Sequence, residues 1–503
     1  SIAIILGTIF IYIKDFNIRR LINVKSDYQT KIIYFQLLIF YLISILPISD
    51  ADSIAVHLYF PSYIFLNGLS NLDLSFFFEF TSFSNSEILL FFSPILKSDN
   101  FGSQLNLFTL IILSIFLIKD KKYFLLILIS CPLIIFFIST QKLQLFFGIL
   151  YLILFLFVHK KVIKTKLEIF IFLFLLSFYA SGKISYILIS IPLFIYFLIN
   201  QKNNLKYIFV SSLLSFLITL LPIFLIKLLY FNNPVAPFFD NIFTQNRLIM
   251  EAYSLSLQSS EGWLNNFSSY KIYLKPFVPT SLNTLTNSFG IMFIIFLFNP
   301  SLMRDVRFFP IFIIILILAT GQILPRYYFE AFLILAFFYD FKTYRIPRFI
   351  IFTQFFIILI FSTLFVSISY INEKVIFNKE NFMNRFTYSY YDSQQIKKLN
   401  ISKNILAFSR DRISLFIPDN IHSMRYIKSF NILNDSNLEN LKNYINDKKI
   451  EYIISDDSSK IPKCIVSDKI AEISQKKSIR NFLNENKSSI NNVYKITKNN
   501  CNL

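Results

Sequence analysis

SDADSIAVHLYFP, residues 49–61, follows directly on an apolar run that ends at Ile48. The stretch places two carboxylates, Asp50 and Asp52, and then His57 where a hydrophobic segment would leave a membrane. Ionisable groups at that depth are costly unless another group pairs with them or the chemistry uses them. We therefore take Asp50 and Asp52 as candidate catalytic residues at a membrane edge.

The composition excludes an ordinary soluble protein. The 503 residues are 55% hydrophobic and 18% aromatic, and they fall into many long apolar runs. Such a pattern indicates a polytopic membrane protein. The net charge of +19 does not indicate nucleic-acid binding, because the basic residues lie mostly in short loops, where they set membrane topology.

The apolar runs predict about twelve transmembrane helices. The first opens at Ser1 and would reach only about 20 Å as a helix, so we expect it to be a shortened span. The runs cover residues 1–14, 31–48, 104–118, 123–139, 143–158, 167–181, 184–199, 207–231, 289–303, 308–324, 328–341 and 349–371.

The loops between these runs alternate in charge. The positive-inside rule assigns the basic loops to the cytoplasm. The segments expected outside are 49–103, the tight turns near Lys142, Lys183 and Arg326, the loop 232–288 and the tail from residue 372. The sequence thus predicts a transmembrane domain over 1–371 in a bacterial inner membrane, with most of the polar chain extracytoplasmic. Within 49–103, the segments Ile54–Leu66 and Glu87–Leu96 predict two amphipathic helices.

The tail, residues 372–503, predicts a small extracytoplasmic α/β domain. Strands are expected at Asn404–Ser409, at Ile450–Ser455 and near Val493–Ile496, and helices from the capping box Ser436–Glu439 and over 468–485. Cys464 and Cys501 could pair in an extracytoplasmic tail, whereas Cys131 lies in an apolar run and is expected to be inert.

Asp52 has two interpretations. It precedes the predicted helix 54–66 and would cap it, but that explains neither the second acid nor the position at the membrane edge. A carboxylate partly desolvated there can act as a general base toward a hydroxyl. Asp50 and Asp52 could also hold a divalent metal, although no further ligand cluster accompanies them and no other cofactor is indicated.

Lys183 and Arg326 stand alone in tight turns on the side that should exclude positive charge. They either extend toward lipid headgroups or hold the phosphate of a lipid-linked donor and stabilise its growing negative charge. Glu87 is either a second acid or a structural anchor, and His57 either contacts substrate or makes a structural hydrogen bond. Four aromatic residues could stack on a sugar, namely Tyr327, Tyr328, Trp263 and Tyr273, and Asp240 and Asn246 could contact a substrate.

Several short motifs occur in a fixed order on the side expected to be outside. The first is Asp52–Leu58 with the turn Asn67-Gly68, and the others are Ser86–Leu90, Ser98–Leu105, Ser181–Tyr186, Asn233–Phe238 and Pro325–Tyr328. Together they resemble GT-C-fold membrane glycosyltransferases of the dolichyl-phosphate-mannose protein mannosyltransferase-like superfamily. The chain departs from that family's pattern at Val56, where Tyr is usual, and at Asn232, where Gly is usual.

The resemblance implies an all-α polytopic GT-C-like domain that transfers a sugar, with inversion, from a polyprenyl-phosphate donor to an acceptor hydroxyl. The acceptor could be a lipid, a glycan or a protein. Asp52, helped by Asp50, would be catalytic, and substrate contacts would come from His57, Glu87, Lys183, Asn233, Arg326 and Tyr327. The alternatives are an envelope polysaccharide polymerase or ligase, a lipid or polysaccharide transporter, and a non-catalytic envelope scaffold.

Overall fold

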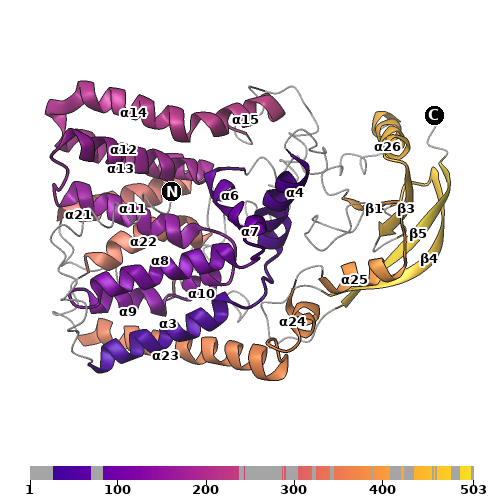
Figure 1. The fold of residues 1–503 in the computed structure, drawn as a ribbon, viewed down its shortest axis with the longest axis horizontal. Helices are drawn as coiled ribbons and strands as arrows, with labels where there is room; N and C mark the ends of the chain where they lie inside the picture. The colour runs from indigo at the N-terminus through magenta and orange to yellow at the C-terminus, as the bar shows by residue number, and fades with distance from the viewer. Residues whose placement is uncertain are drawn as a thin grey trace.

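The computed structural model of the chain is mostly helical and ends in a small sheet (Figure 1). It describes residues 27–68, 83–236, 243, 286, 288–290, 304–319, 324–339, 345–387, 390–407, 421–423, 435–455, 458, 461–476 and 488–499.

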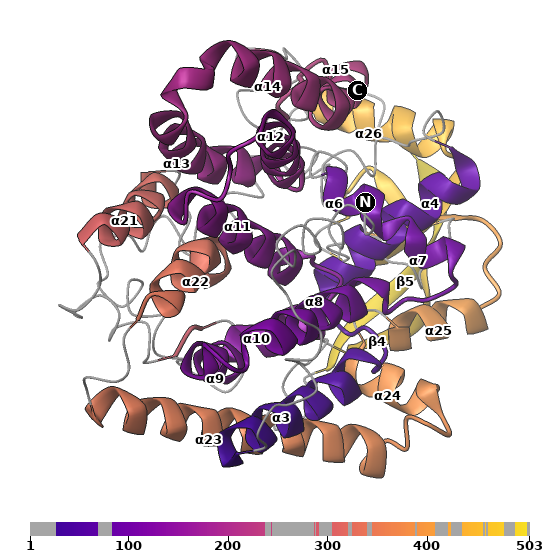
Figure 2. The ribbon, with the colours of Figure 1, turned by 60° about the vertical axis from the view of Figure 1, so that its left-hand side comes forward.

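Apolar helices of 7 to 23 residues lie side by side and make up the larger part of the described chain (Figures 1 and 2). They are α3 (Tyr28–Ser44), α8 (Phe101–Leu117), α9 (Lys122–Ser130), α10 (Pro132–Ile138), α11 (Gln144–His159), α12 (Lys166–Ser181), α13 (Ile184–Asn200), α14 (Leu205–Thr219), α15 (Leu221–Phe231), α21 (Arg304–Ala319), α22 (Phe329–Phe337) and α23 (Arg345–Ser367). Short turns of other helix types, η5 (Lys202–Asn204), η6 (Pro325–Tyr328) and η7 (Ile368–Asn372), adjoin them.

The local sequence explains where several of these helices begin or break. Thr165 and Glu168 form a reciprocal capping box at the start of α12. Pro132 separates α9 from α10, because its ring fits the first turn of a helix but not an interior position. Pro222 has the same position at the start of α15.

Helices occupy most of each predicted apolar run that the structure describes, except that residues 289 and 290 are not helical. Residues 1–14 and the rest of 289–303 lie outside the described part. Among the described residues, one continuous helical segment, Arg348–Asn372, is long and apolar enough to cross a membrane. A second span is added if Ile184–Asn200 and Lys202–Thr219, bent by 91°, count as one. The number of spans therefore stays a prediction.

The core lies where α10, α11 and α22 meet. The rings of Phe137 and Phe329 pack edge to face with centroids 4.9 Å apart. At Gly148 in α11 an added Cβ would stand 2.6 Å from the Phe329 ring, so the glycine allows α11 and α22 to approach closely. This contact positions the turn that precedes α22, which carries Arg326.

The described residues between 49 and 100 include short helices at the end of the helical layer that faces the sheet (Figure 1). They are the π-helix η2 (Ser53–Leu58), α4 (Tyr59–Asn67), α6 (Asn85–Leu90) and α7 (Phe92–Ile95). The two helices predicted for this segment are confirmed, the first as η2 running into α4 and the second with a break at Phe91.

The C-terminal part combines helices with a mixed five-stranded sheet of order β2-β1-β3-β5-β4. Its elements are α24 (Lys379–Phe386), α25 (Tyr390–Lys398), β1 (Asn404–Ala407), β2 (Ile421–Ser423), α26 (Asp435–Asp447), β3 (Ile450–Ser455), β4 (Ile465–Lys476) and β5 (Ser488–Asn499). β1 pairs parallel with β2 and β3, whereas β5 pairs antiparallel with β3 and β4. The predicted strands at 404, 450 and 493 and the helix opening near 436 are confirmed.

The helix predicted over 468–485 is wrong in its described part, because residues 465–476 form strand β4. Ile465 and Ile473 are buried there, and the strand pairs with β5 along its length. Long-range pairing thus overrides a weak local helix preference. Cys464, next to this strand, takes part in a disulfide; its predicted partner Cys501 lies outside the described residues. Cys131 is buried and free.

Candidate functional site

Asp50 and Asp52 differ in their hydrogen bonds to the start of η2. The Asp50 carboxylate accepts hydrogen bonds from the Ser53 backbone N–H (3.1 Å) and hydroxyl (2.9 Å) at the start of η2. Asp52 makes no such bond, so the prediction that Asp52 caps this helix is wrong. The reason is local: the Asp52 backbone is already helical (φ −67°, ψ −38°), whereas a capping side chain normally needs an extended backbone.

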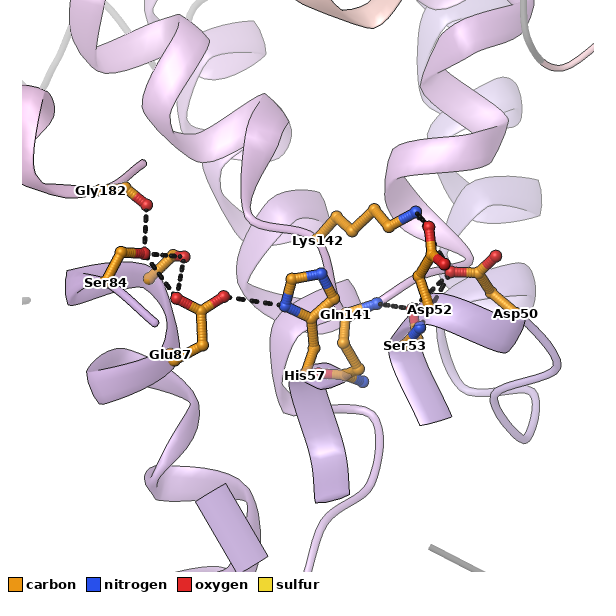
Figure 3. A network of polar contacts seen from close by, with 10 residues as sticks. Asp50, Asp52, Ser53, His57, Ser84, Glu87, Gln141, Lys142 and Gly182 are labelled. Carbon is orange, nitrogen blue, oxygen red and sulfur yellow. Dashed lines mark hydrogen bonds and ion pairs between the residues drawn. The ribbon is translucent and has the colours of Figure 1, made fainter. Parts of the chain in front are cut away.

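Lys142, in the turn before α11, joins the two acids. Its Nζ lies 2.6 Å from Asp52 Oδ2 and 3.5 Å from Asp50 Oδ2, and it stands 4.9 Å from the centroid of the Phe136 ring. The side chain is only 8% exposed. Figure 3 shows the ammonium reaching Asp52 from the opposite side of the cluster to Asp50.

Arg326 shares a cavity with these three residues. The cavity has a volume of about 180 Å³ and is completed by Leu133, Phe136, Leu324 and Pro325. Its polar lining therefore consists of two carboxylates, an ammonium and a guanidinium, drawn from three distant segments. The Nε of Arg326 is buried and has no hydrogen-bond partner within the described part of the chain, which leaves a donor available for a ligand.

His57 and Glu87 form a second polar pair beside this cluster (Figure 3). His57 Nδ1 lies 3.0 Å from Glu87 Oε1, and the hydroxyls of Ser84 and Ser86 donate to Glu87 Oε2. Burial of Glu87 works to raise its pKa, but the hydrogen bond and charge of His57, with the two serine hydroxyls, outweigh it and hold the pKa below its ordinary value. Glu87 is thus an ionised, fully buried carboxylate that orients His57.

The helix α6 that carries Glu87 is attached to the end of α12. The Ser84 hydroxyl lies 2.7 Å from the Gly182 carbonyl, and the Asn85 side chain reaches the Ser181 hydroxyl at 2.5 Å. Asn85 also donates to the Thr219 carbonyl at 3.1 Å. These contacts fix the position of the His57–Glu87 pair relative to the turn that contains Lys183.

Lys183 and Tyr327 form a third polar group. Lys183 Nζ donates to the Tyr327 hydroxyl at 3.2 Å, and the Arg326 guanidinium lies 5.4 Å from the Tyr327 ring centroid. Burial works to raise the pKa of Tyr327, but the two neighbouring cations lower it to about 7. Arg326 therefore stands between this group and the cavity.

Asn233 lies apart from the cavity lining. It is fully buried, and its side-chain oxygen accepts from the Val235 backbone N–H at 3.0 Å, which closes a local turn after α15. Tyr328 is buried in the core. Trp263, Tyr273, Asp240 and Asn246 lie outside the described residues.

The structure thus brings Asp50, Asp52 and Arg326 together, with His57–Glu87 and Lys183–Tyr327 as neighbouring pairs. The sequence interpretation omitted Lys142. The signal that singled out Lys183 and Arg326, a lone basic residue in a turn expected outside, also applies to Lys142.

The donor set does not fit a divalent metal. Within the described ranges, no group of three or more His, Cys, Asp and Glu residues has the geometry to hold one. The Lys142 ammonium also lies within 3.5 Å of an oxygen of each carboxylate and would repel a second cation. We therefore derive no step through a metal.

No family model, curated protein or solved structure matches this chain. The resemblance to GT-C-fold glycosyltransferases remains an expectation from the sequence motifs, and the chemistry has to be argued from the site.

Proposed function

We propose that this protein is an integral membrane glycosyltransferase. It transfers a sugar from a polyprenyl-phosphate donor to an acceptor hydroxyl on the extracytoplasmic face, with inversion at the anomeric carbon. One observation carries the proposal: two carboxylates and Arg326 line one cavity, and the buried Nε of Arg326 has no hydrogen-bond partner among the described residues.

The membrane part of the proposal rests on the outer helices, whose exposed side chains are apolar. A soluble protein seldom exposes such continuous apolar faces, whereas a lipid bilayer requires them. Examples are Phe209, Leu213, Leu217 and Leu229 on α14 and α15, Phe308 and Ile315 on α21, and Phe349, Ile357 and Ile360 on α23. These faces favour a multi-pass arrangement with the cavity at one membrane surface.

The chemistry follows from the charges around the cavity. Arg326 holds the donor phosphate, whose negative charge increases as the bond between the anomeric carbon and the phosphate oxygen breaks. Asp52, beside Asp50, accepts the proton of the acceptor hydroxyl, whose oxygen attacks the anomeric carbon from the face opposite the leaving phosphate. The products are the glycosylated acceptor, polyprenyl phosphate and a protonated carboxyl group.

The remaining predicted residues support this centre. His57 and Lys183 stand in pairs next to the cavity, so we assign them to the borders of the substrate site. The C-terminal sheet lies at the same end of the helical layer as the helices of 49–103 (Figure 1). We assign it the role of covering the site or presenting a lipid, glycan or protein acceptor.

The test uses purified full-length protein in lipid nanodiscs with synthetic polyprenyl-phosphate sugars. Loss of the lipid-linked sugar is followed for the wild type and for Asp52→Asn, with Asp120→Asn as the matched control. Asp120 is exposed in the turn between α8 and α9, at the other end of α8 from the cavity. We expect Asp52→Asn to lower turnover about 100-fold or more and Asp120→Asn to leave it unchanged.

Two outcomes would overturn the proposal. One is equal turnover of the wild type and Asp52→Asn. The other is the absence of turnover with every donor while the same preparation moves a lipid-linked sugar or polysaccharide across a bilayer, which would favour a transporter. Extension of a glycan chain from a lipid-linked oligosaccharide would instead identify a polymerase.

A further inference from the structure

Lys142 is the residue of this site that the proposed function leaves without a role. We infer that Lys142 controls Asp52: its ammonium neutralises Asp52 until the donor enters the cavity and then moves to the donor phosphate, which frees Asp52 to act as the base. This inference rests on the proposed function, because it specifies how the same cavity orders its substrates.

The Lys142 ammonium lies within reach of two possible partners, Asp52 and an anion bound in the cavity. The Lys142 ammonium is closest to Asp52, at 2.6 Å, yet it lines the same cavity as Arg326. A lysine carries its charge on a flexible four-carbon stem, so a small rotation can move the ammonium from a carboxylate to an anion in the cavity. The Phe136 ring beneath Nζ offers a cation–π contact that accompanies such a movement.

The charges of the lining indicate what causes the movement. Two carboxylates oppose two cations, so the cavity is close to neutral without a ligand. Arg326, whose Nε has no hydrogen-bond partner in the described part of the chain, can bind the donor phosphate first. The phosphate then competes with Asp52 for Lys142, because its two non-bridging oxygens can accept from Arg326 and from the ammonium at the same time.

The consequence is an order of events. While Lys142 Nζ lies 2.6 Å from Asp52 Oδ2, the ammonium neutralises the carboxylate, which makes Asp52 a weak acceptor for a hydroxyl proton. Once Lys142 has moved, Asp52 takes the proton, the acceptor oxygen bonds to the anomeric carbon, and polyprenyl phosphate leaves with its charge held by Arg326 and Lys142. The donor must therefore bind before the acceptor can be activated.

The test measures binding without turnover, using the product polyprenyl phosphate and the uncharged polyprenyl alcohol as probes in nanodiscs. Lys142→Met should weaken polyprenyl phosphate binding about tenfold, whereas Lys142→Arg should retain most of it. Asp52→Asn should tighten binding about fivefold, because Lys142 is then no longer held by a carboxylate. This gain cannot come from misfolding.

The decisive comparison is a double-mutant cycle, in which Asp52→Asn should lose its effect once Lys142 is Met. The matched control is Lys121→Met. Lys121 also stands over a phenylalanine ring, at 4.7 Å from Phe337, but lies at the other end of the helices and should not affect binding.

Two results separate this inference from the proposed function. In the first, the wild type prefers polyprenyl phosphate to polyprenyl alcohol, but Lys142→Met binds the phosphate equally well or Asp52→Asn tightens binding with and without Lys142. The role of Lys142 is then wrong and the transferase proposal stands. If the wild type shows no preference for the phosphate, both fail.

Discussion

Asp50 and Asp52 stand one residue apart, but their partners give them different roles. Asp50 bonds to Ser53 and so holds the start of η2, and its Oδ2 lies 3.5 Å from Lys142 Nζ, whereas Asp52 Oδ2 lies 2.6 Å from that ammonium. We predict that Asp50→Ala lowers the free energy of unfolding by about 1 kcal/mol through loss of the cap. Thermal unfolding in detergent checks this. A change in turnover without any change in stability would contradict the structural role.

Glu87 gives a pH-dependent prediction. Its pKa in the folded protein is below the unfolded value, so its contribution to stability is complete above the unfolded pKa and is lost as pH falls through the folded pKa. Glu87→Gln should therefore lower the melting temperature most near neutral pH, and the difference from the wild type should shrink on acidification.

The control for Glu87 is Glu472→Gln in strand β4, which removes an exposed glutamate and should change the melting temperature little. A Glu87→Gln difference that stays constant or grows with falling pH would contradict the assignment of Glu87 as an ionised partner of His57.

Tyr327 gives a spectroscopic prediction. With its pKa lowered to about 7, part of the Tyr327 hydroxyl is ionised near neutral pH, and tyrosinate absorbance should show one tyrosine titrating there. Lys183→Met removes the hydrogen-bonded cation and should move this step to higher pH. Tyr327→Phe is the control that should remove the step, and a step that survives it would belong to another tyrosine.

At the scale of elements, η2 determines which side chains share a face. A π-helix has wider turns than an α-helix and often occurs at functional sites. Its i→i+5 pattern returns His57 toward the face of Asp52, whereas an α-helix would turn it farther away. Figure 3 accordingly shows His57 between Glu87 and the Lys142–Asp52 pair.

The close packing of α11 against α22 gives a testable prediction. Gly148→Val would push on Phe329, three residues after Arg326, because even a Cβ would stand 2.6 Å from that ring. We expect a loss of about 1–3 kcal/mol in unfolding free energy and weaker polyprenyl phosphate binding. The measurement is thermal unfolding together with the nanodisc binding assay.

Two further variants make that prediction specific. Phe329→Ala in the Gly148→Val background should recover part of the binding, because it removes the ring that the valine displaces. Ile153→Val, a milder change on the half-buried side of α11, should affect neither measurement. If Gly148→Val lowers binding equally with and without Phe329→Ala, the Gly148–Phe329 contact does not position Arg326.

At the scale of the whole molecule, the proposed topology places the two ends of α8 on opposite sides of a membrane. Asp99 and Asp120 flank this 17-residue helix, which is about 25 Å long, and both side chains are exposed. We predict that a membrane-impermeant thiol reagent added to intact spheroplasts labels Asp99→Cys but not Asp120→Cys.

The labelling is done in a background in which Cys131, Cys464 and Cys501 are replaced by serine, and permeabilised cells give the control in which both positions react. Labelling of both positions in intact spheroplasts, or of neither in permeabilised cells, would contradict the predicted topology.

The sequence alone predicted much of the local structure. Long apolar runs placed the helices, because their length and composition leave few other conformations. A short apolar run in the same way predicted the strand Ile450–Ser455. The prediction of a helix failed at 465–476, where the residues form a strand because β5 is available to pair with them. No property of the segment itself encodes that partner.

The candidate site was also predicted only in part from the sequence. The sequence pointed to Asp50, Asp52 and Arg326 as charges that an apolar environment would not tolerate without a use. Only the tertiary structure placed Arg326 in a cavity with acids more than 270 positions earlier in the chain, brought Lys142 to both acids and gave the cap to Asp50. Hydrophobic periodicity determines helices locally, whereas the pairing of charges depends on which helix ends the packing brings together.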